Sequence, residues 1–312
     1  MNKRCVWLGA LLVLAALGPA WADEPVAYIT EIQRTDAGDV EVKLAGDSDW
    51  RPSRPLLALR PGDQVRARGT ARAVVLFHAG GGTQVVAPES SPLSIGAPAT
   101  TGGVTEQLRV LTAGVGRFLM GKQDPPQYRR LSTRSVTLPP VIVAPRNTRL
   151  LARGPVFEWE GSSRARYALR VVGPGGVLWE QADVPRAQFA YPATAPRLTP
   201  GVRYTWELEV RGHQIQRAEF ELVPDAEAQR VRDALAALAG ARGYSPGTLA
   251  LMRAVVLYEA GLYDDARRET QGAATAAPRD PTPVLLLGYV YERMGLASKA
   301  AEAFDRAKVL AR

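Results

Sequence analysis

The C-terminal part of the sequence repeats itself after 34 residues, and this repeat constrains the fold more than any other feature of the chain. Helical repeats of this length bury their apolar faces only by stacking on neighbouring helical pairs. We therefore expect residues 225–312 to form stacked helices. The residues that recur are Gly261 and Gly295, Leu262 and Leu296, Ala266 and Ala300, and Ala273 and Ala307.

Three residues of the second copy, Gly288, Tyr291 and Phe304, stand at the offsets of a tetratricopeptide repeat, and this part of the chain resembles that family. The small Gly288 lets the paired helices approach closely, while the two aromatic rings fill the groove between neighbours. Two repeats cannot cover both of their ends. Residues 225–239 carry apolar side chains at helical spacing, so we expect them to form an extra helix over the open side.

The resemblance to tetratricopeptide repeats implies a concave surface for a peptide or a partner helix. On that surface we predict protein-binding residues at Arg253, Tyr258, Tyr289 and Arg293, in an exposed groove. The alternative is that the two repeats only cap or dimerise the protein.

The first residues follow the signal-peptide pattern: Lys3 and Arg4 precede an apolar run over 5–17, and Ala20-Trp21-Ala22 precedes Asp23. The run is too short for an ordinary spanning helix, and small residues favour cleavage between Ala22 and Asp23. We expect a signal peptide over 1–22 and a periplasmic mature protein without an integral membrane segment. An uncleaved membrane anchor is the alternative.

Charge and cysteine content narrow the classes of partner. Cys5 is the single cysteine and lies in the signal segment, so the mature chain would have neither disulfides nor cysteine-bound metal. Removal of Lys3 and Arg4 lowers the formal net charge from +8 to +6. Arginines are scattered and do not form one stripe with aromatic residues, so we expect no nucleic-acid partner.

Residues 23–96 alternate short apolar segments with turns, which predicts an antiparallel β sandwich or roll. Val40 and Val42 lie on one face of a strand, and Glu41 and Lys43 lie on the other. The expected strands cover 26–32, 40–44, 56–59, 64–68, 73–77, 83–86 and 93–95.

The order of motifs in this region resembles the FecR domain, a periplasmic module of signalling regulators. Its most specific element is Leu59-Arg60-Pro61-Gly62-Asp63-Gln64-Val65, followed by the apolar strand 73–77. Many relatives have an aspartate-glycine pair after that strand, but this chain has His78-Ala79-Gly80, which weakens any ligand inference from that turn. Only Met1–Arg4 precede the apolar run, so we expect no direct anti-sigma activity.

Residues 97–140 are expected to form a linker that contains a short amphipathic helix. Leu108, Leu111, Val115 and Leu119 recur at helical spacing, and the helix should end near Gly121. We expect it to brace one sheet.

Period-two alternation returns over residues 141–223 and predicts a second sandwich of about seven strands. The series Phe157-x-Trp159, Tyr167 and Tyr204-x-Trp206 is similar to immunoglobulin-like and fibronectin-like modules of envelope proteins. We expect these aromatic residues to form a core, with a sugar platform as the minor alternative. The expected strands cover 141–143, 157–159, 167–171, 177–179, 188–191, 204–210 and 218–222.

The sequence has no arrangement typical of catalysis, metal binding or a cofactor. His78 and His213 have no neighbour at metal-ligand spacing. The serine pairs 90–91 and 162–163 lie in predicted loops, and the glycines 80–82 lack the Lys-Ser or Lys-Thr of a phosphate-binding loop. We therefore predict a non-catalytic protein with no cofactor.

The predicted fold is multidomain, β then α: a FecR-like sandwich or roll, an Ig-like sandwich, and C-terminal helical repeats. The leading hypothesis is a periplasmic adaptor or sensor of a FecR-type envelope signalling system. Its repeats would bind a protein partner, such as the outer part of a membrane signalling receptor. The alternative is an envelope scaffold that binds polysaccharide or peptidoglycan, with glycan as the ligand of the β modules.

Overall fold

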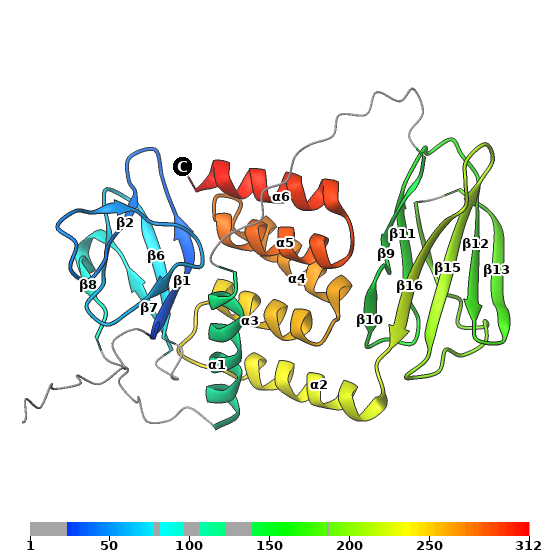
Figure 1. The fold of residues 1–312 in the computed structure, drawn as a ribbon, viewed down its shortest axis with the longest axis horizontal. Helices are drawn as coiled ribbons and strands as arrows, with labels where there is room; N and C mark the ends of the chain where they lie inside the picture. Colours follow the sequence, from blue (N-terminus) through cyan, green and yellow to red (C-terminus); the bar gives the residue numbers. More distant parts are fainter. Residues whose placement is uncertain (1–23, 78–81, 97–105, 123–138, 186, 312) are drawn as a thin grey trace, which may run out of the picture.

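The computed structural model describes residues 24–77, 82–96, 106–122, 139–185 and 187–311. Along this part of the chain the order is β then α, apart from one helix that lies between the two β regions in sequence. In space the helices lie in the middle, with one β region on each side (Figure 1).

The first β region consists of two four-stranded antiparallel sheets. Val40 and Val42 are buried while Glu41 and Lys43 are half-buried, as the alternation predicted. One sheet has the order β4 (Ala58–Leu59), β1 (Ala27–Gln33), β6 (Arg72–Phe77) and β7 (Gly82–Val86). The other has the order β3 (Arg51–Pro52), β2 (Val40–Lys43), β5 (Gln64–Ala67) and β8 (Leu93–Ser94), and a 3-10 turn, η2, covers Pro88–Ser90.

The Pro-Gly-Asp turn before β5 shows why its residue types are needed. Gly62 has a φ of 94°, a conformation that side chains rarely adopt. The Asp63 carboxylate accepts hydrogen bonds from the N–H groups of Arg60 and Ala45, each at 2.8 Å. The turn thus joins the start of β5 to the loop after β2.

The second β region is a sandwich of a five-stranded and a three-stranded sheet around buried aromatic rings. Trp206 and Phe157 are fully buried with ring centroids 4.8 Å apart, and Trp206 Nε1 donates to the carbonyl of Pro145 at 2.7 Å. The larger sheet has the order β10 (Thr148–Leu150), β16 (Gln216–Leu222), β15 (Arg203–Val210), β12 (Tyr167–Gly173) and β13 (Gly176–Val184). The smaller one has the order β14 (Gln188–Ala190), β11 (Val156–Glu160) and β9 (Val141–Ala144).

Five consecutive helices follow the second β region. Gly261 and Gly295 have φ values of 75° and 72°, and each forms the tight turn inside a helical pair. A Cβ at Gly288 would lie 2.6 Å from Phe304, so glycine is what allows this close approach. The helices are α2 (Asp225–Ala239), α3 (Pro246–Glu259), α4 (Tyr263–Ala276), α5 (Pro281–Arg293) and α6 (Ala297–Leu310).

Helix α1 (Glu106–Met120) forms where the sequence predicted it, but the expected contact with a sheet is only a minor part of its packing. It lies mainly against α2 and α3, with a smaller contact to β1. Its buried face carries Leu108, Val115 and Leu119. The prediction of a brace against a sheet was therefore wrong in its main partner, since α1 packs chiefly on helices of the repeats.

The hydrophobic core of the helices extends into both β regions. Tyr28 and Leu76 of the first region and Val143 of the second belong to the same buried cluster as the residues of α1 to α6. Separate clusters lie inside each β region. The repeats are therefore packed between two partners of the same chain.

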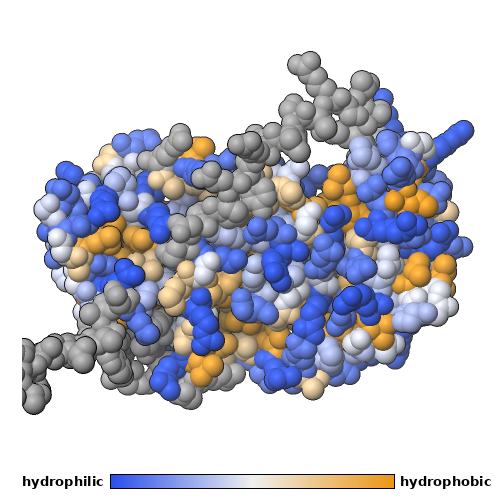
Figure 2. Space-filling model, in the orientation of Figure 1, coloured by the Kyte–Doolittle hydropathy of each residue, from blue (hydrophilic) through white to orange (hydrophobic). Residues whose placement is uncertain are grey.

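The surface view in Figure 2 shows hydrophilic residues over most of the described face, with hydrophobic residues in smaller patches among them. None of the helices in the described ranges is both long enough and apolar enough to cross a membrane.

Candidate functional site

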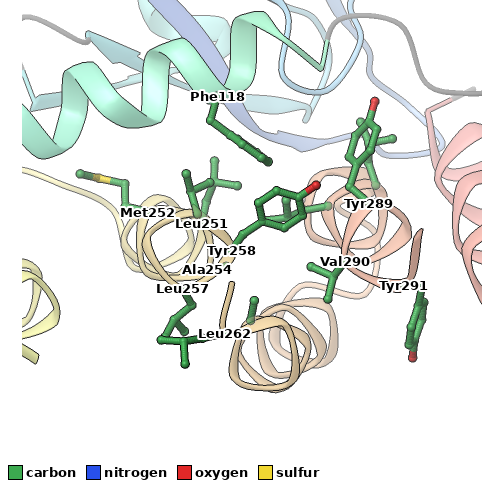
Figure 3. Packing of buried hydrophobic residues seen from close by; sticks show 14 of the residues in the cluster. Phe118, Leu251, Met252, Ala254, Leu257, Tyr258, Leu262, Tyr289, Val290 and Tyr291 are labelled. Carbon is green, nitrogen blue, oxygen red and sulfur yellow. The ribbon is translucent and has the colours of Figure 1, made fainter. Parts of the chain in front are cut away.

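The structure divides the four predicted binding residues among three places. Tyr258 on α3 and Tyr289 on α5 are 7% and 2% exposed, so the expectation of an exposed groove was wrong for both. Arg253 on α3 is half-buried, and Arg293 is exposed in the last turn of α5. Phe118 of α1 packs against Tyr258 (Figure 3), while Tyr289 packs against Phe304 of α6 and contacts Lys122, which follows α1.

Tyr258 and Tyr289 form what we call the tyrosine surface, and the C-terminal end of α1 packs on it. The ring of Phe118 meets that of Tyr258 edge to face, with centroids 4.9 Å apart. Lys122 Nζ lies 4.6 Å from the ring centroid of Tyr289 and 5.5 Å from that of Tyr258. The Tyr289 hydroxyl donates to the carbonyl of Lys122 at 3.1 Å. Burial raises the pKa of the Tyr258 phenol.

Arg293 lies apart from this surface and is held by Tyr263 at the start of α4. Its Nη2 and Nε donate to the Tyr263 hydroxyl at 2.7 and 2.9 Å. These hydrogen bonds raise the pKa of the Arg293 guanidinium. Arg293 therefore braces the outer side of the helices and does not join the other predicted residues.

A cavity of about 520 Å³ lies between β1, α3, α4 and α5, and Arg253 lines it. Arg253 Nε donates to the carboxylate of Glu269 at 2.8 Å, which joins α3 to α4 beside the cavity. Most of the remaining lining is small and apolar, as Ala250 and Ala273 illustrate. The cavity is also lined by Thr282, which is 1% exposed and adjoins Asp280.

Two carboxylates close the cavity at the β1 end. Glu31 accepts a hydrogen bond from the N–H of Thr248 at 2.8 Å, and Asp280 accepts one from the N–H of Thr282 at 2.9 Å. Asp280 also accepts from the N–H of Ile32 at 3.4 Å. Desolvation raises the pKa of Asp280 to about 7. Strand β1 thus contacts both helix N-termini, with a carboxylate at the start of α3 and with an N–H donor to Asp280, the N-cap of α5.

The second β region holds the opposite ends of the same two helices through the turn between β9 and β10. Arg146 Nε donates to the carbonyl of Met294 at 3.0 Å, next to Gly295. Arg149 Nη1, at the start of β10, donates to the carbonyl of Ala260 at 3.2 Å, next to Gly261. Cationic side chains at helix C-termini are stabilising. Both repeats are therefore anchored at equivalent positions of the 34-residue period.

Residues of α4 and α6 form ion pairs with β11. Arg267 is 7% exposed and contacts Asp264 at 2.8 Å and Glu158 at 2.7 Å. Burial acts to lower the pKa of Arg267, but these two carboxylates outweigh it and raise the pKa. Lys299 pairs with Glu160 on the same face of β11.

Residues considered for chemistry lie in structural roles or outside the described ranges. Ser91 Oγ accepts from the N–H of Ala67 at 2.8 Å and donates to the carbonyl of Ala87 at 2.9 Å. His78, Gly80 and Gly81 lie outside the described residues. Within the described ranges, no three His, Cys, Asp or Glu side chains are grouped closely enough to hold a metal ion.

Sequence reasoning missed Phe118, Lys122 and Glu31, which make the contacts described above. The spacing of Phe118 and Lys122, one turn apart near the end of a predicted helix, was a usable signal for the first two. Glu31 had no comparable signal, since its position in a strand does not indicate which helix lies opposite. No protein-family model matches the chain, and no curated protein matches it either.

Proposed function

We propose that this chain is a non-catalytic adaptor or sensor of a FecR-type signalling system in the bacterial periplasm, and that its helical repeats bind a protein partner. The observation that carries this proposal is the cavity of about 520 Å³ between β1, α3, α4 and α5, which includes the predicted residue Arg253. The FecR-like Pro-Gly-Asp turn and the signal-like first residues support the signalling and periplasmic parts.

The lining of the cavity suits a polypeptide segment with small apolar side chains. Ala250, Ala273 and Leu286 supply apolar surface, and burial of such surface is favourable by about 25 cal/mol per Å². Arg268 lines the cavity with a side chain that is 46% exposed and so supplies hydrogen-bond donors to a peptide carbonyl. A peptide backbone has both donors and acceptors to match such a site.

Photocrosslinking in the periplasm tests this proposal with the full chain. Gly272 lines the cavity, is exposed, and a Cβ there meets no atom within 4 Å, so a photoreactive phenylalanine analogue fits at this position. The control carries the analogue at Val177 in β13, which is 58% exposed on the second β region. A protein adduct specific to position 272 supports the adaptor. The same adducts at both positions, or none at position 272, contradict it.

A second candidate function is an envelope scaffold that binds polysaccharide or peptidoglycan. Anchoring of α3 and α5 at both ends favours this reading, because it makes the repeats a rigid support between the β regions. Cosedimentation with purified peptidoglycan separates the two. The scaffold requires peptidoglycan binding by the full chain that survives Gly272→Trp, a change that fills part of the cavity, whereas the adaptor requires no peptidoglycan binding by the wild-type chain.

The periplasmic location has its own test. N-terminal sequencing of the exported protein should give Asp23 as the first residue. A first residue of Met1 contradicts cleavage and favours the anchored alternative.

A further inference from the structure

Helix α1 contacts the repeats as a ligand helix contacts its receptor. Its buried positions include Leu108, Thr112, Val115, Phe118 and Leu119, all 9% exposed or less. Their spacing places them on one helix face, the pattern by which amphipathic helices bind apolar surfaces of other proteins. The hydroxyl of Thr112 donates to the carbonyl of Leu108 inside α1 and leaves that face without an unpaired polar group.

The C-terminal end of α1 adds a more specific contact. Lys122 Nζ lies within 5.7 Å of three ring centroids, those of Phe118, Tyr258 and Tyr289. A cation that approaches an aromatic face in this way is stabilised by about 0.5–2 kcal/mol. The groups of this segment that contact the two tyrosines are thus an aromatic ring in the last turn of α1 and a lysine just beyond its end at Met120.

The position of α1 in the sequence makes this contact replaceable. Tyr258 and Tyr289 belong to helices that follow α1 by more than a hundred residues. None of the four sheets contains a strand from residues 106–120. An isolated helix of about 15 residues is only marginally stable in water, so α1 depends on the surface beneath it. Its outer side exposes Val110 (61%) and Met120 (49%), which its present site leaves uncovered.

We propose that the tyrosine surface is a helix-binding site that α1 occupies as a built-in ligand, and that a partner protein binds it with an amphipathic helix that has an aromatic residue in its last turn and a lysine four positions later, just after the helix. This site differs from the cavity beside Arg253, and the inference does not rest on the adaptor function. Release of α1 would be coupled to partner binding, so the intact chain binds weakly until α1 is displaced.

A labelled synthetic peptide of residues 106–122 serves as the probe, and its binding to the full mature chain is followed by fluorescence anisotropy. Phe118→Ala or Lys122→Ala should weaken the binding of α1 to the tyrosine surface. Peptide binding should then tighten by about tenfold or more, because the fraction of chains with an unoccupied tyrosine surface rises. The matched control is Val110→Ala, on the exposed side of α1, which should bind as weakly as the wild type.

A second series changes the probe and leaves the chain constant. A peptide with alanine in place of both Phe118 and Lys122 should bind the Lys122→Ala chain at least about tenfold more weakly than the unchanged peptide. If Phe118→Ala prevents folding, as judged by circular dichroism, Lys122→Ala alone decides the result, since this residue is only half-buried.

Equal peptide affinity for the wild type and for a folded Lys122→Ala chain would overturn the proposal. Equal affinity for the two peptides would overturn it as well. A gain of self-association in Lys122→Ala without peptide binding, seen by light scattering, would assign the surface to a second copy and would also reject an external partner.

Discussion

The carboxylate of Glu31 accepts a hydrogen bond from the N–H of Thr248 at 2.8 Å, although the two residues are 217 positions apart in sequence. Ser245, the N-cap of α3, lies beside them and also contacts this carboxylate. A strand of the first β region therefore helps to cap a helix of the repeats. The stability of that helix and of the interface should consequently change together.

Glu31→Ala should lower the free energy of unfolding by about 1–2 kcal/mol, since it removes a capping carboxylate from a half-buried helix N-terminus. Glu31→Gln should cost less, because the amide oxygen still accepts from Thr248. Urea unfolding followed by circular dichroism measures both. Glu24→Ala, at an exposed position, is the control and should have no effect. Equal losses for alanine and glutamine would argue against capping as the role of Glu31.

Arg267→Ala should destabilise the protein by about 3 kcal/mol or more, because it removes the buried cation that pairs with the buried carboxylate of Asp264 and the half-buried one of Glu158. The neighbouring Arg268 contacts the same two carboxylates but is 46% exposed. Arg268→Ala should therefore cost about 1 kcal/mol or less. The comparison uses the free energies of unfolding of the two variants. Similar losses at both positions would show that the burial of Arg267 adds nothing to the free energy of unfolding.

Asp280 should make stability depend on pH in a defined direction. Its pKa is raised from 3.8 to about 7, so between these values the folded chain holds a proton that the unfolded chain releases. The free energy of unfolding should fall as pH rises across this range and level off above it. Asp280→Asn keeps a good N-cap side chain and should remove this slope, so that it exceeds the wild type in stability at pH 8.

Urea unfolding at pH 4.5, 6 and 8 checks the Asp280 prediction. The control is Asp36→Asn, at an exposed position, which should follow the wild type at every pH. Parallel curves for the wild type and Asp280→Asn would remove Asp280 as the source of the pH dependence.

Gly288→Ala should destabilise the repeats by about 1–3 kcal/mol, because its methyl group would lie 2.6 Å from the ring of Phe304. In the double variant with Phe304→Leu, the loss should be smaller than the sum of the two single losses, since the shorter side chain relieves the clash. Gly272→Ala is the matched control in α4. A Cβ there meets no atom within 4 Å, so this change should stabilise the helix by up to about 1 kcal/mol. Additive losses would contradict the packing role of Gly288.

Much of the secondary structure could be predicted because its causes are local. Alternation marked β2 and β15, whose burial follows the pattern of their apolar residues. The bounds of α2 coincide with the predicted 225–239. In contrast, β10 was missed, because a strand of three residues that pairs in parallel with β16 has too short a pattern to stand out.

The candidate site was predictable only in part, because burial depends on contacts between distant segments. Tyr258 and Tyr289 were correctly placed on the helices, but nothing near them in sequence indicates that α1 covers them. Arg253 was predicted in an exposed groove, whereas the structure places it half-buried in a cavity that β1 closes at one end, and no local pattern indicates that strand. The assignment to FecR and tetratricopeptide families stays a prediction.

Helices α3 and α5 contain 14 and 13 residues, and each meets the first β region with its first turn and the second β region with its last carbonyls. A helix of this length spans about 20 Å. The two helices consequently set the distance between the two β regions. A molecule that binds both β regions at once must therefore span this distance, whatever side chains it carries.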